Sequence, residues 1–370
     1  MKKKTRLNQV VSIIISFIFL IAMPQFTFAE SNLMSSEEKT ESIIDRLGGT
    51  VSTERLSEKD NAFYASNGNC NIVIPKSGNN EIELQNQAAC LTVKLPYHQT
   101  LNEAKRAEDT VIYSSIYSSN SDPSIKYAVQ GLAYKEGSGL RCLIIIENST
   151  APKRYSYEFN LNKGQRIVRS EDCANKEEAT RGYLYIVDEN KAESESIFYI
   201  EPAWAKDSNG KDIPTHYEIE GNTVTQVVEF DENTTFPVVA DPAMSGYYYK
   251  KANVSYSNEW SSAKRCSDNV TASKGETGSI SCSKTVSFSG SVSGSIYGIS
   301  TIGIGKSYST TTGYTLTFKG PATKYMTYKA YYKVENGTRQ KYHMNTNKLV
   351  SSNKYTVKNI QYGRYALKSV

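Results

Sequence analysis

From residue 60 onward the chain is dominated by short segments in which apolar and polar residues alternate. CLTVKLP (residues 90–96) and YSYEFNL (residues 155–161) are examples. Because successive side chains of a strand leave opposite faces, this period of two predicts half-buried β-strands. Gly, Asn, Asp, Ser and Pro separate the segments at short intervals, which is typical of sheets built from hairpins. The pattern predicts an all-β protein with two β-sandwich-like domains.

The longest alternation is SISCSKTVSFSGSVSGSI (residues 279–296). Every odd position from 279 to 295 holds Ser or Thr, and the even positions from 282 hold Cys, Lys, Val, Phe, Gly, Val, Gly and Ile. This predicts a strand with its apolar face packed inward and its hydroxyl face in solvent. The pattern also fits a pore-forming hairpin, with apolar side chains toward lipid and hydroxyls toward the lumen. Lys284 on the apolar face argues against that alternative, although one Lys is tolerable near a membrane interface.

Helix signals are strongest in residues 30–60. The sequence Ser-Ser-Glu-Glu from Ser35 gives an N-cap followed by acidic residues in the first turn, and an apolar stripe from Ile43 to Leu47 precedes Gly48-Gly49. A capping side chain, first-turn acids and a terminal Gly are start and stop signals of a helix. We therefore expect a short helical leader here, and a second short helix over residues 101–108.

A turn signal interrupts the tyrosine-rich sequence YMTYKAYYKVENGTRQKYHM (residues 325–344). Asn336-Gly337 lies near its centre, with strand-forming sequence on both sides. Asn-Gly readily adopts the positive φ angles of a two-residue type I′ turn. The sequence therefore predicts a hairpin that reverses at Asn336-Gly337.

The first 29 residues have the features of a secretory signal peptide. The basic start MKKKTR precedes the apolar run from Val10 to Met23, and small residues, Thr27 and Ala29, stand at the −3 and −1 positions of the expected cleavage site. The apolar run is shorter than the roughly 20 residues of a transmembrane helix. We expect residues 1–29 to be removed and the rest to be secreted into the extracellular region, with no stable membrane span.

Acidic and basic residues are unevenly divided along the chain. The whole sequence has 43 Lys and Arg against 38 Asp and Glu, but residues 243–370 have 18 bases and only 4 acids. The change follows Asp241-Pro242, where a strand-like segment ends. It divides the chain into an acidic β-rich module (residues 61–242) and a basic, Tyr- and Ser-rich β domain (residues 243–370). The electric field of so unbalanced a domain determines which charged partners approach it.

The composition of the basic domain indicates a binding function. It holds 15 of the 27 Tyr residues, and Tyr rings beside Lys or Arg form amphipathic contact surfaces. We expect it to bind an anionic polymer of a cell wall or an anionic lipid surface, with no cofactor and no nucleic acid; the alternative is a secreted toxin or bacteriocin-like protein that forms pores. The residues expected to contact the polymer are Lys250, Lys251, Lys324, Tyr328, Lys329, Tyr331, Lys333, Arg339 and Lys341.

All six cysteines follow the signal peptide. An even number in an oxidising compartment favours disulfides. Joining neighbours along the chain predicts the pairs Cys70 with Cys90, Cys142 with Cys173, and Cys266 with Cys282. None of them stands in a CxxC motif or beside a His at ligand spacing, so we expect no metal site.

No segment carries a catalytic motif. The three histidines lie on separate segments, without the spacing of a zinc site, and no nucleophile motif is present. A wall hydrolase needs two carboxyl groups in defined roles, and the basic domain offers few candidates. We therefore expect a non-enzymatic protein and keep a wall hydrolase as a third alternative. The carboxylates of the basic domain are Glu259, Asp268, Glu276 and Glu335.

Residues 201–242, EPAWAKDSNGKDIPTHYEIEGNTVTQVVEFDENTTFPVVADP, carry a recognisable pattern. They resemble a segment of uncharacterised secreted proteins of Gram-positive bacteria, in which W-A-x-D-x-x-G-x-x-[IV]-P-T-x-Y-E leads to [YF]-P-V-V-A-D-P. The likeness extends over roughly residues 120–242 and implies an exported β-rich module, with no activity attached to it. The matching positions are Trp204, Asp207, Gly210, Pro214, Tyr217, Gly221, Asn222, Gln226 and residues 236–242.

Overall fold

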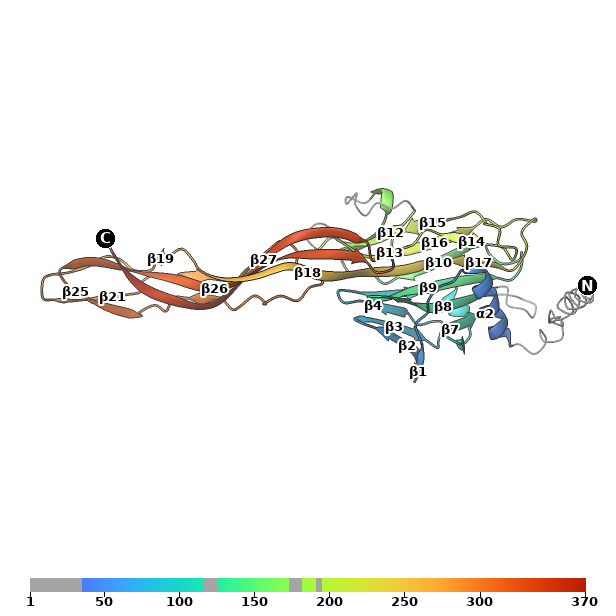
Figure 1. Cartoon of the computed structure of the whole chain (residues 1–370), viewed down its shortest axis with the longest axis horizontal. Helices are drawn as coiled ribbons and strands as arrows, with labels where there is room; N and C mark the ends of the chain where they lie inside the picture. Colours follow the sequence, from blue (N-terminus) through green and yellow to red (C-terminus); the bar gives the residue numbers. More distant parts are fainter. Residues whose placement is uncertain (1–34, 116–124, 173–181, 191–194) are drawn as a thin grey trace, which may run out of the picture.

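Antiparallel strands make up most of the chain, as the period of two predicts. A computed structural model describes residues 35–115, 125–172, 182–190 and 195–370, so the expected signal peptide, residues 1–29, lies outside the described residues. The predicted all-β class is confirmed. Figure 1 shows an elongated molecule in which residues before 243 form a body and residues 243–370 form a narrow extension that ends far from it.

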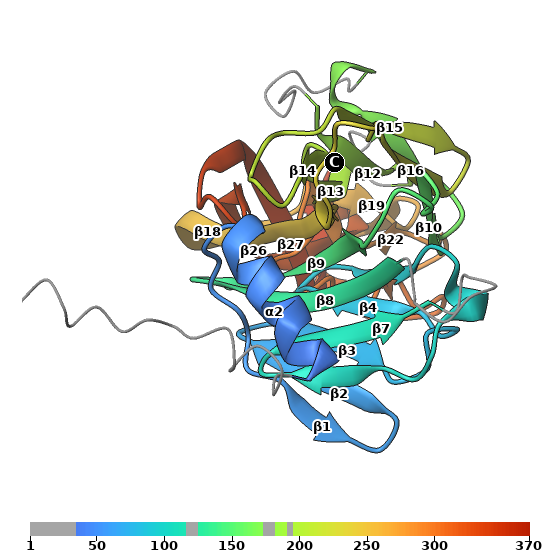
Figure 2. The same cartoon turned by 90° about the vertical axis from the view of Figure 1, so that its right-hand side faces the viewer.

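The helical leader is confirmed as α2 (Ser36–Leu47). Ser35 Oγ accepts the N–H of Glu38 at 3.1 Å, and the Glu38 carboxylate accepts the N–H of Ser35 at 2.7 Å, which completes a capping box. The helix ends at Gly48. Figure 2 shows α2 lying across β7 (Thr110–Ser114), β8 (Ile125–Tyr134) and β9 (Gly137–Ile146) on the outer face of the body. Its Ile44 and Leu47 side chains belong to a buried apolar cluster with residues of these three strands.

The first sheet of the body has eight strands in the order β1-β2-β3-β4-β5-β10-β16-β15. Neighbouring strands are antiparallel, and strands such as β4 and β10 bury every second side chain, whereas β1 at the edge is fully exposed. The strands are β1 (Ser57–Lys59), β2 (Ala62–Asn67), β3 (Cys70–Pro75), β4 (Ile82–Gln85), β5 (Cys90–Lys94), β10 (Arg154–Phe159), β15 (Thr215–Glu220) and β16 (Thr223–Val228).

The second sheet belongs to both body and extension, and its main path is β11-β12-β13-β18-β9-β8-β7-β6. In addition, β17 pairs with β9, and β14 pairs with β17. The short 3-10 helices η2 (His98–Thr100) and η3 (Ser170–Asp172) connect strands of the body. The strands of the second sheet in the body are β6 (Lys105–Ala107), β7 (Thr110–Ser114), β8 (Ile125–Tyr134), β9 (Gly137–Ile146), β11 (Gln165–Arg169), β12 (Leu184–Asp188), β13 (Glu195–Ile200), β14 (Trp204–Lys206) and β17 (Val238–Asp241).

The main core lies between the two sheets, and β9 shows how it is built. All ten residues of this strand are buried. Leu140, Cys142 and Ile144 belong to the core between the sheets, whereas Leu143 and Ile145 pack under α2 on the other side. The contacts under α2 therefore form a second apolar layer outside the sandwich. Burying each large apolar side chain in such a layer contributes about 1.5–3 kcal/mol to stability.

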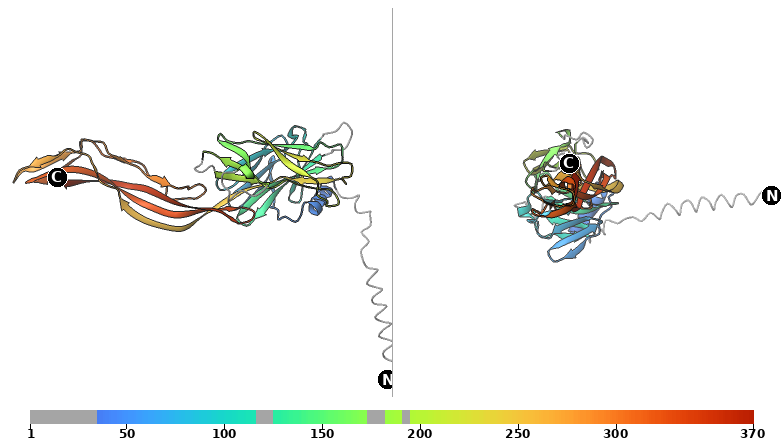
Figure 3. Two further views of the ribbon diagram at one scale, coloured as in Figure 1. Left: turned by 90° about the horizontal axis from the view of Figure 1, so that it is seen from above. Right: turned by 90° about the vertical axis from the view of Figure 1, so that its left-hand side faces the viewer.

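Three long antiparallel strands form the extension. They are β18 (Ala243–Trp260), β26 (Ala322–His343) and β27 (Leu349–Ser369), of 18, 22 and 21 residues, and β26 pairs with both of the others. Figures 1 and 3 show long strands running along the extension. At about 3.3 Å per residue, the longest spans roughly 70 Å. β18 begins at the predicted domain boundary, yet its first residues pair with β13 and β9 of the body. One continuous strand therefore links the two parts.

Two local predictions are wrong. Residues 101–108 are not a helix, because β6 forms there and pairs with β7. Asn336-Gly337 is not a turn, because both residues lie inside β26 and pair with β27. A Cβ on Gly337 would lie 2.5 Å from Oη of Tyr355, so the glycine leaves room for that ring. The chain reverses instead between β26 and β27, where Asn347 has a φ of 55°.

Candidate functional site

The two ends of residues 277–319 leave the three-stranded sheet and pair with each other. Two short ladders form, β21 with β25 and β22 with β24. In both ladders the residue numbers of the two partners sum to 596, as in Thr277 with Lys319 and Phe288 with Tyr308, so the ladders share one register. Backbone hydrogen bonds from Cys282 N to Tyr314 O and from Thr310 N to Val286 O keep this register between the ladders. We call this segment the 277–319 hairpin. Its strands are β21 (Thr277–Ser281), β22 (Ser287–Phe288), β24 (Tyr308–Ser309) and β25 (Thr315–Lys319).

One face of this hairpin carries hydroxyls and the other is largely apolar. In a register that adds up to 596, odd positions pair with odd ones, and every odd position from 301 to 317 is Ser, Thr or Gly. The odd positions from 279 to 293 are exposed, whereas Ile280, Cys282 and Val286 are buried. The predicted hydroxyl face in solvent and apolar face packed inward are confirmed.

The apolar face of the paired arms rests on the extension. Ile280 and Val286 join a cluster with Met326 and Tyr328 of β26. The Phe288 ring centroid lies 6.1 Å from that of Tyr328. Tyr328, one of the residues predicted to contact a polymer, is therefore covered by the hairpin and buried.

Beyond the pair formed by Phe288 and Tyr308 the arms of the hairpin separate. We call residues 289–307 the tip segment. Its strand β23 (Ser291–Ser293) pairs with the outer edge of β27, in register with residues 356–358. A Cβ on residue 290 would lie 2.8 Å from the carbonyl oxygen of Lys358, so Gly290 lets the tip segment approach β27 closely. The tip segment therefore takes β27 as its partner in place of its own second arm.

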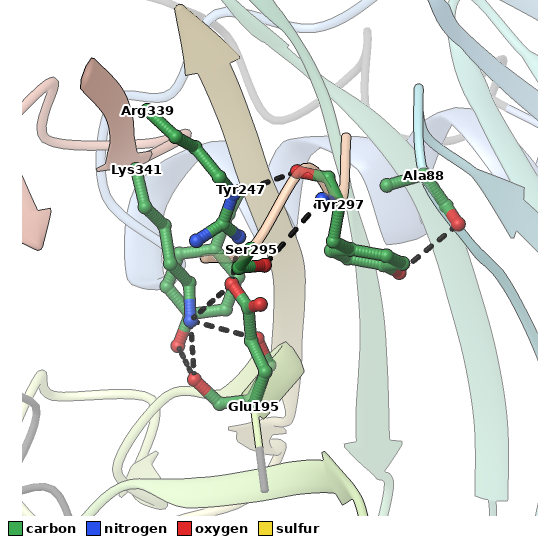
Figure 4. A network of polar contacts seen from close by, with 8 residues as sticks. Ala88, Glu195, Tyr247, Ser295, Tyr297, Arg339 and Lys341 are labelled. Atoms are coloured by element: carbon green, nitrogen blue, oxygen red, sulfur yellow. Dashed lines mark hydrogen bonds and ion pairs between the residues drawn. The ribbon is translucent and has the colours of Figure 1, made fainter. Parts of the chain in front are cut away.

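Tyr297 fastens the turn of the tip segment to the body (Figure 4). Its hydroxyl donates to the carbonyl of Ala88 at 3.0 Å, and its own carbonyl accepts from Nε of Arg339 at 2.7 Å. Its ring meets Tyr249 edge-on, with centroids 5.6 Å apart. Gly298 follows with a φ of +76°, in a place where a Cβ would overlap the Tyr249 ring.

Arg339 and Lys341 hold body and extension together (Figure 4). Both side chains are buried, with 2% and 1% of their area exposed, and both lie on Glu195 of β13 as an ion-paired group. Lys341 Nζ also donates to the carbonyl and hydroxyl of Ser196, at 2.8 and 2.7 Å. A buried ion pair is costly to break by removing one partner. These two predicted polymer-binding residues therefore lie at an internal junction.

Glu335 is the second anchor of the tip segment. Its fully buried carboxylate accepts hydrogen bonds from the N–H of Ile302 at 2.9 Å, from the hydroxyl of Tyr355 at 2.7 Å and from Lys251 at 3.1 Å. Burial acts to raise the pKa of Glu335, but these hydrogen bonds outweigh it and lower the pKa below the usual Glu value. Lys251, another predicted polymer ligand, serves this anchor.

The remaining predicted polymer ligands are divided among three places. Lys250 pairs with Glu136 of the body at 2.8 Å. Lys324 lies 5.8 Å from the Phe318 ring of the hairpin. Lys329, Tyr331 and Lys333 share one face of β26, since they are alternate residues of one strand. The nine residues therefore do not form one continuous patch.

No disulfide joins the described cysteines, which are Cys70, Cys90, Cys142, Cys266 and Cys282, and Cys173 lies outside the described residues. Cys266 and Cys282 lie in one buried cluster, where their thiols donate to the carbonyls of Met326 and Lys284, each at 3.5 Å. Burial, with the neighbouring Cys282 thiol, raises the pKa of Cys266 to about 12. The pair of Cys70 with Cys90 is disfavoured, because β4 separates their strands by about 10 Å.

The described ranges contain no cluster of three or more His, Cys, Asp or Glu residues that could hold a metal ion. Among the helices in those ranges, none combines the length and apolar character needed to cross a bilayer. His343 packs against the rings of Tyr199 and Tyr247, at 4.7 and 5.1 Å between centroids. His343 therefore contributes to the aromatic packing at the junction of body and extension.

Trp204, Gln226 and Asp241 of the 201–242 pattern join one hydrogen-bonded network. Nε1 of Trp204 donates to Asp241 at 3.0 Å, and Nε of Arg141 donates to the same carboxylate at 3.1 Å. Gln226 donates to the carbonyl of Trp204 at 3.2 Å. These contacts close the body where β14 and β17 meet, so they give the pattern a structural role. No family model and no curated protein matches this chain.

The sequence pattern alone does not predict that residues 308–319 pair with residues 277–288 in one constant register. The alternation in residues 279–296 was visible, but the matching Ser, Thr and Gly positions in residues 301–317 are apparent only when the sequence is folded back about residue 298. The tyrosine and charged residues that fasten the tip segment carry no local signal, since their partners are distant in the chain.

Proposed function

We propose that this chain is a secreted, non-enzymatic protein that forms pores in membranes, and that the 277–319 hairpin is the segment that inserts. One observation carries this proposal: two arms that share a single register also share a hydroxyl face and an apolar face. A strand that crosses a bilayer beside an aqueous lumen needs that alternation.

The dimensions of the hairpin suit a membrane crossing. If the tip segment pairs in the existing register, each arm from the aromatic pair Phe288 and Tyr308 to Gly298 has 11 residues, and a tilted transmembrane strand needs about 9–11. The two rings would stand at the near interface, where aromatic residues are enriched. Lys306, two residues from Tyr308, lies close enough to that interface for its long side chain to reach water.

Insertion requires the tip segment to leave β27 and pair with itself. The contact of Tyr297 with the body and the anchor at Glu335 oppose this change, so they hold the tip segment on β27. An isolated hairpin would expose unpaired backbone groups to lipid, which costs several kcal/mol per group. Several copies must therefore insert side by side, so that hairpins pair into a closed ring.

A cross-link between the tip segment and β27 tests the proposal. Val292 and Val357 are partners in the ladder, so Val292→Cys with Val357→Cys can form a disulfide that holds the tip segment in place. We expect the oxidised double variant to release no dye from liposomes, and reduction to restore release. The single variant Val292→Cys is the control. Equal release by the oxidised and reduced double variant would overturn the proposal.

Adhesion to an anionic wall polymer is the second candidate function, and the 18 bases against 4 acids in residues 243–370 favour it. Four of the nine residues first expected to bind a polymer, Lys324, Lys329, Tyr331 and Lys333, are neither fully buried nor engaged in an ion pair described above. Salt-sensitive sedimentation with purified cell walls, without dye release from liposomes, would select this function over pore formation.

A further inference from the structure

Three aromatic rings gather on one face of the extension. Trp260, Tyr331 and Tyr362 are neighbours across β18, β26 and β27, because Trp260 pairs with Tyr331 and Tyr331 pairs with Tyr362. Their ring centroids lie 4.9, 5.0 and 5.6 Å apart. Tyr362 is 47% exposed, so the described chain leaves this cluster open to solvent.

Basic side chains surround the three rings. Lys329 Nζ lies 4.2 Å from the Trp260 ring, and Lys333 Nζ lies 5.6 Å from the ring of Tyr256, which is 58% exposed. Arg364 is exposed and pairs in register with Lys329. We call Trp260, Tyr331, Tyr362, Lys329, Lys333 and Arg364 the Trp260 patch.

Acidic groups are absent from the exposed part of this face. Residues 243–370 are all described, so their four acids can be placed. Glu335 lies on the same face of β26 as Lys333 but is buried, and Glu259 pairs with Tyr332 on the opposite face and with Lys358. Asp268 pairs with Lys284, and Glu276 accepts from the N–H of Ser273. The Trp260 patch is therefore uniformly positive.

We propose that the Trp260 patch docks the protein onto a bilayer that contains anionic phospholipid. The inference rests on the proposed pore-forming function and supplies its first step. Tyr and Trp rings have an apolar body and a polar edge, which suits the headgroup level of a membrane. Lys and Arg are attracted to anionic headgroups. This attraction extends over roughly a Debye length, about 8 Å at physiological ionic strength, and weakens as the salt concentration rises.

Two variants of equal charge provide the test. Lys329→Gln with Lys333→Gln removes two bases from the Trp260 patch, whereas Lys324→Gln with Lys354→Gln removes two bases from the opposite face of the same sheet. Each base near an anionic surface contributes about fivefold to affinity. In sedimentation with liposomes of phosphatidylserine and phosphatidylcholine, we expect the first variant to bind about 25-fold more weakly and the second to bind like wild type.

Trp260→Ala gives an independent measurement, because intrinsic fluorescence of the wild type should shift to the blue on binding and the variant should lose most of this shift. Circular dichroism checks that each variant is folded. Equal weakening by both double variants, or binding to purified wall polymer but not to liposomes, would overturn the inference. The cross-linked Val292→Cys, Val357→Cys protein should still bind without releasing dye, so failure of docking and failure of pore formation are distinguishable.

Discussion

Single residues decide how firmly the tip segment is held. Glu335 collects three donors from three different segments: Lys251 from β18, Tyr355 from β27, and the N–H of Ile302 from the tip segment. Hydrogen bonds to a charged group are stronger than those between neutral groups, at about 1.5–3 kcal/mol. One carboxylate therefore couples the tip segment to the sheet.

Glu335→Gln should weaken this anchor by about 2 kcal/mol, because the charge-assisted bonds are lost. We expect faster dye release at neutral pH and a lower thermal midpoint. Glu259→Gln is the matched control, since it removes an exposed carboxylate paired with Lys358 on the same extension. Identical release rates for the two variants would contradict a specific role for Glu335.

Acid should act on the same anchor. The pKa of Glu335 is lowered in the folded protein. Its carboxylate therefore stabilises attachment of the tip segment to the sheet at pH values above the usual Glu pKa of about 4.3. This stabilisation is lost as the pH falls through the lowered pKa. Dye release by the wild type should therefore rise below about pH 4. Glu335→Gln should lack this rise, and a variant that keeps the full acid response would contradict the assignment.

At the scale of elements, the sequence predicts what depends on local pattern. The strands, the helix at Ser36–Leu47 and the outward hydroxyl face follow from periodicity and capping, which neighbouring residues determine. Asn336-Gly337 shows the limit of such reasoning. Its turn propensity is overridden because β26 pairs along its length with β27, and the glycine is used to admit the Tyr355 ring.

The candidate site could be predicted only in part for the same reason. The alternation of residues 279–296 pointed to a two-faced strand, but Tyr297, Glu335 and Arg339 meet through contacts between distant parts of the chain. Charge and tyrosine content alone predict nine polymer-binding residues. Pairing across β18, β26 and β27 instead decides which of them share a face, and periodicity within one strand does not contain that information.

The base of the hairpin should contain a disulfide in an oxidising compartment. Cys266 and Cys282 lie in one buried cluster, and the backbone N–H groups of Ser283 and Lys284 donate to the carbonyl of Cys266. Treatment with oxidised glutathione should join them, with loss of two protons and two electrons to the glutathione disulfide, and peptide mapping should find the link. Cys266→Ser should leave Cys282 alkylatable after denaturation. Alkylation of both thiols in the oxidised wild type would contradict this pairing.

At the scale of the whole molecule, the acidic body and the basic extension meet through specific contacts. Arg339 and Lys341 of the extension are buried on Glu195 of the body, and Lys250 pairs with Glu136. The body also holds Tyr297 of the tip segment. In our proposal the body therefore restrains the inserting segment, while the far half of the extension, with its open aromatic and basic face, meets the membrane.

A scan of the tip segment tests the central claim most directly. Single cysteines at residues 291–296 and 301–304, in a background with Cys90 and Cys173 replaced by Ser, would carry an environment-sensitive fluorophore, and a lipid-borne quencher would be added with the liposomes. The account predicts quenching at even positions and little at odd ones. Quenching without this alternation, or none at any position, would contradict it.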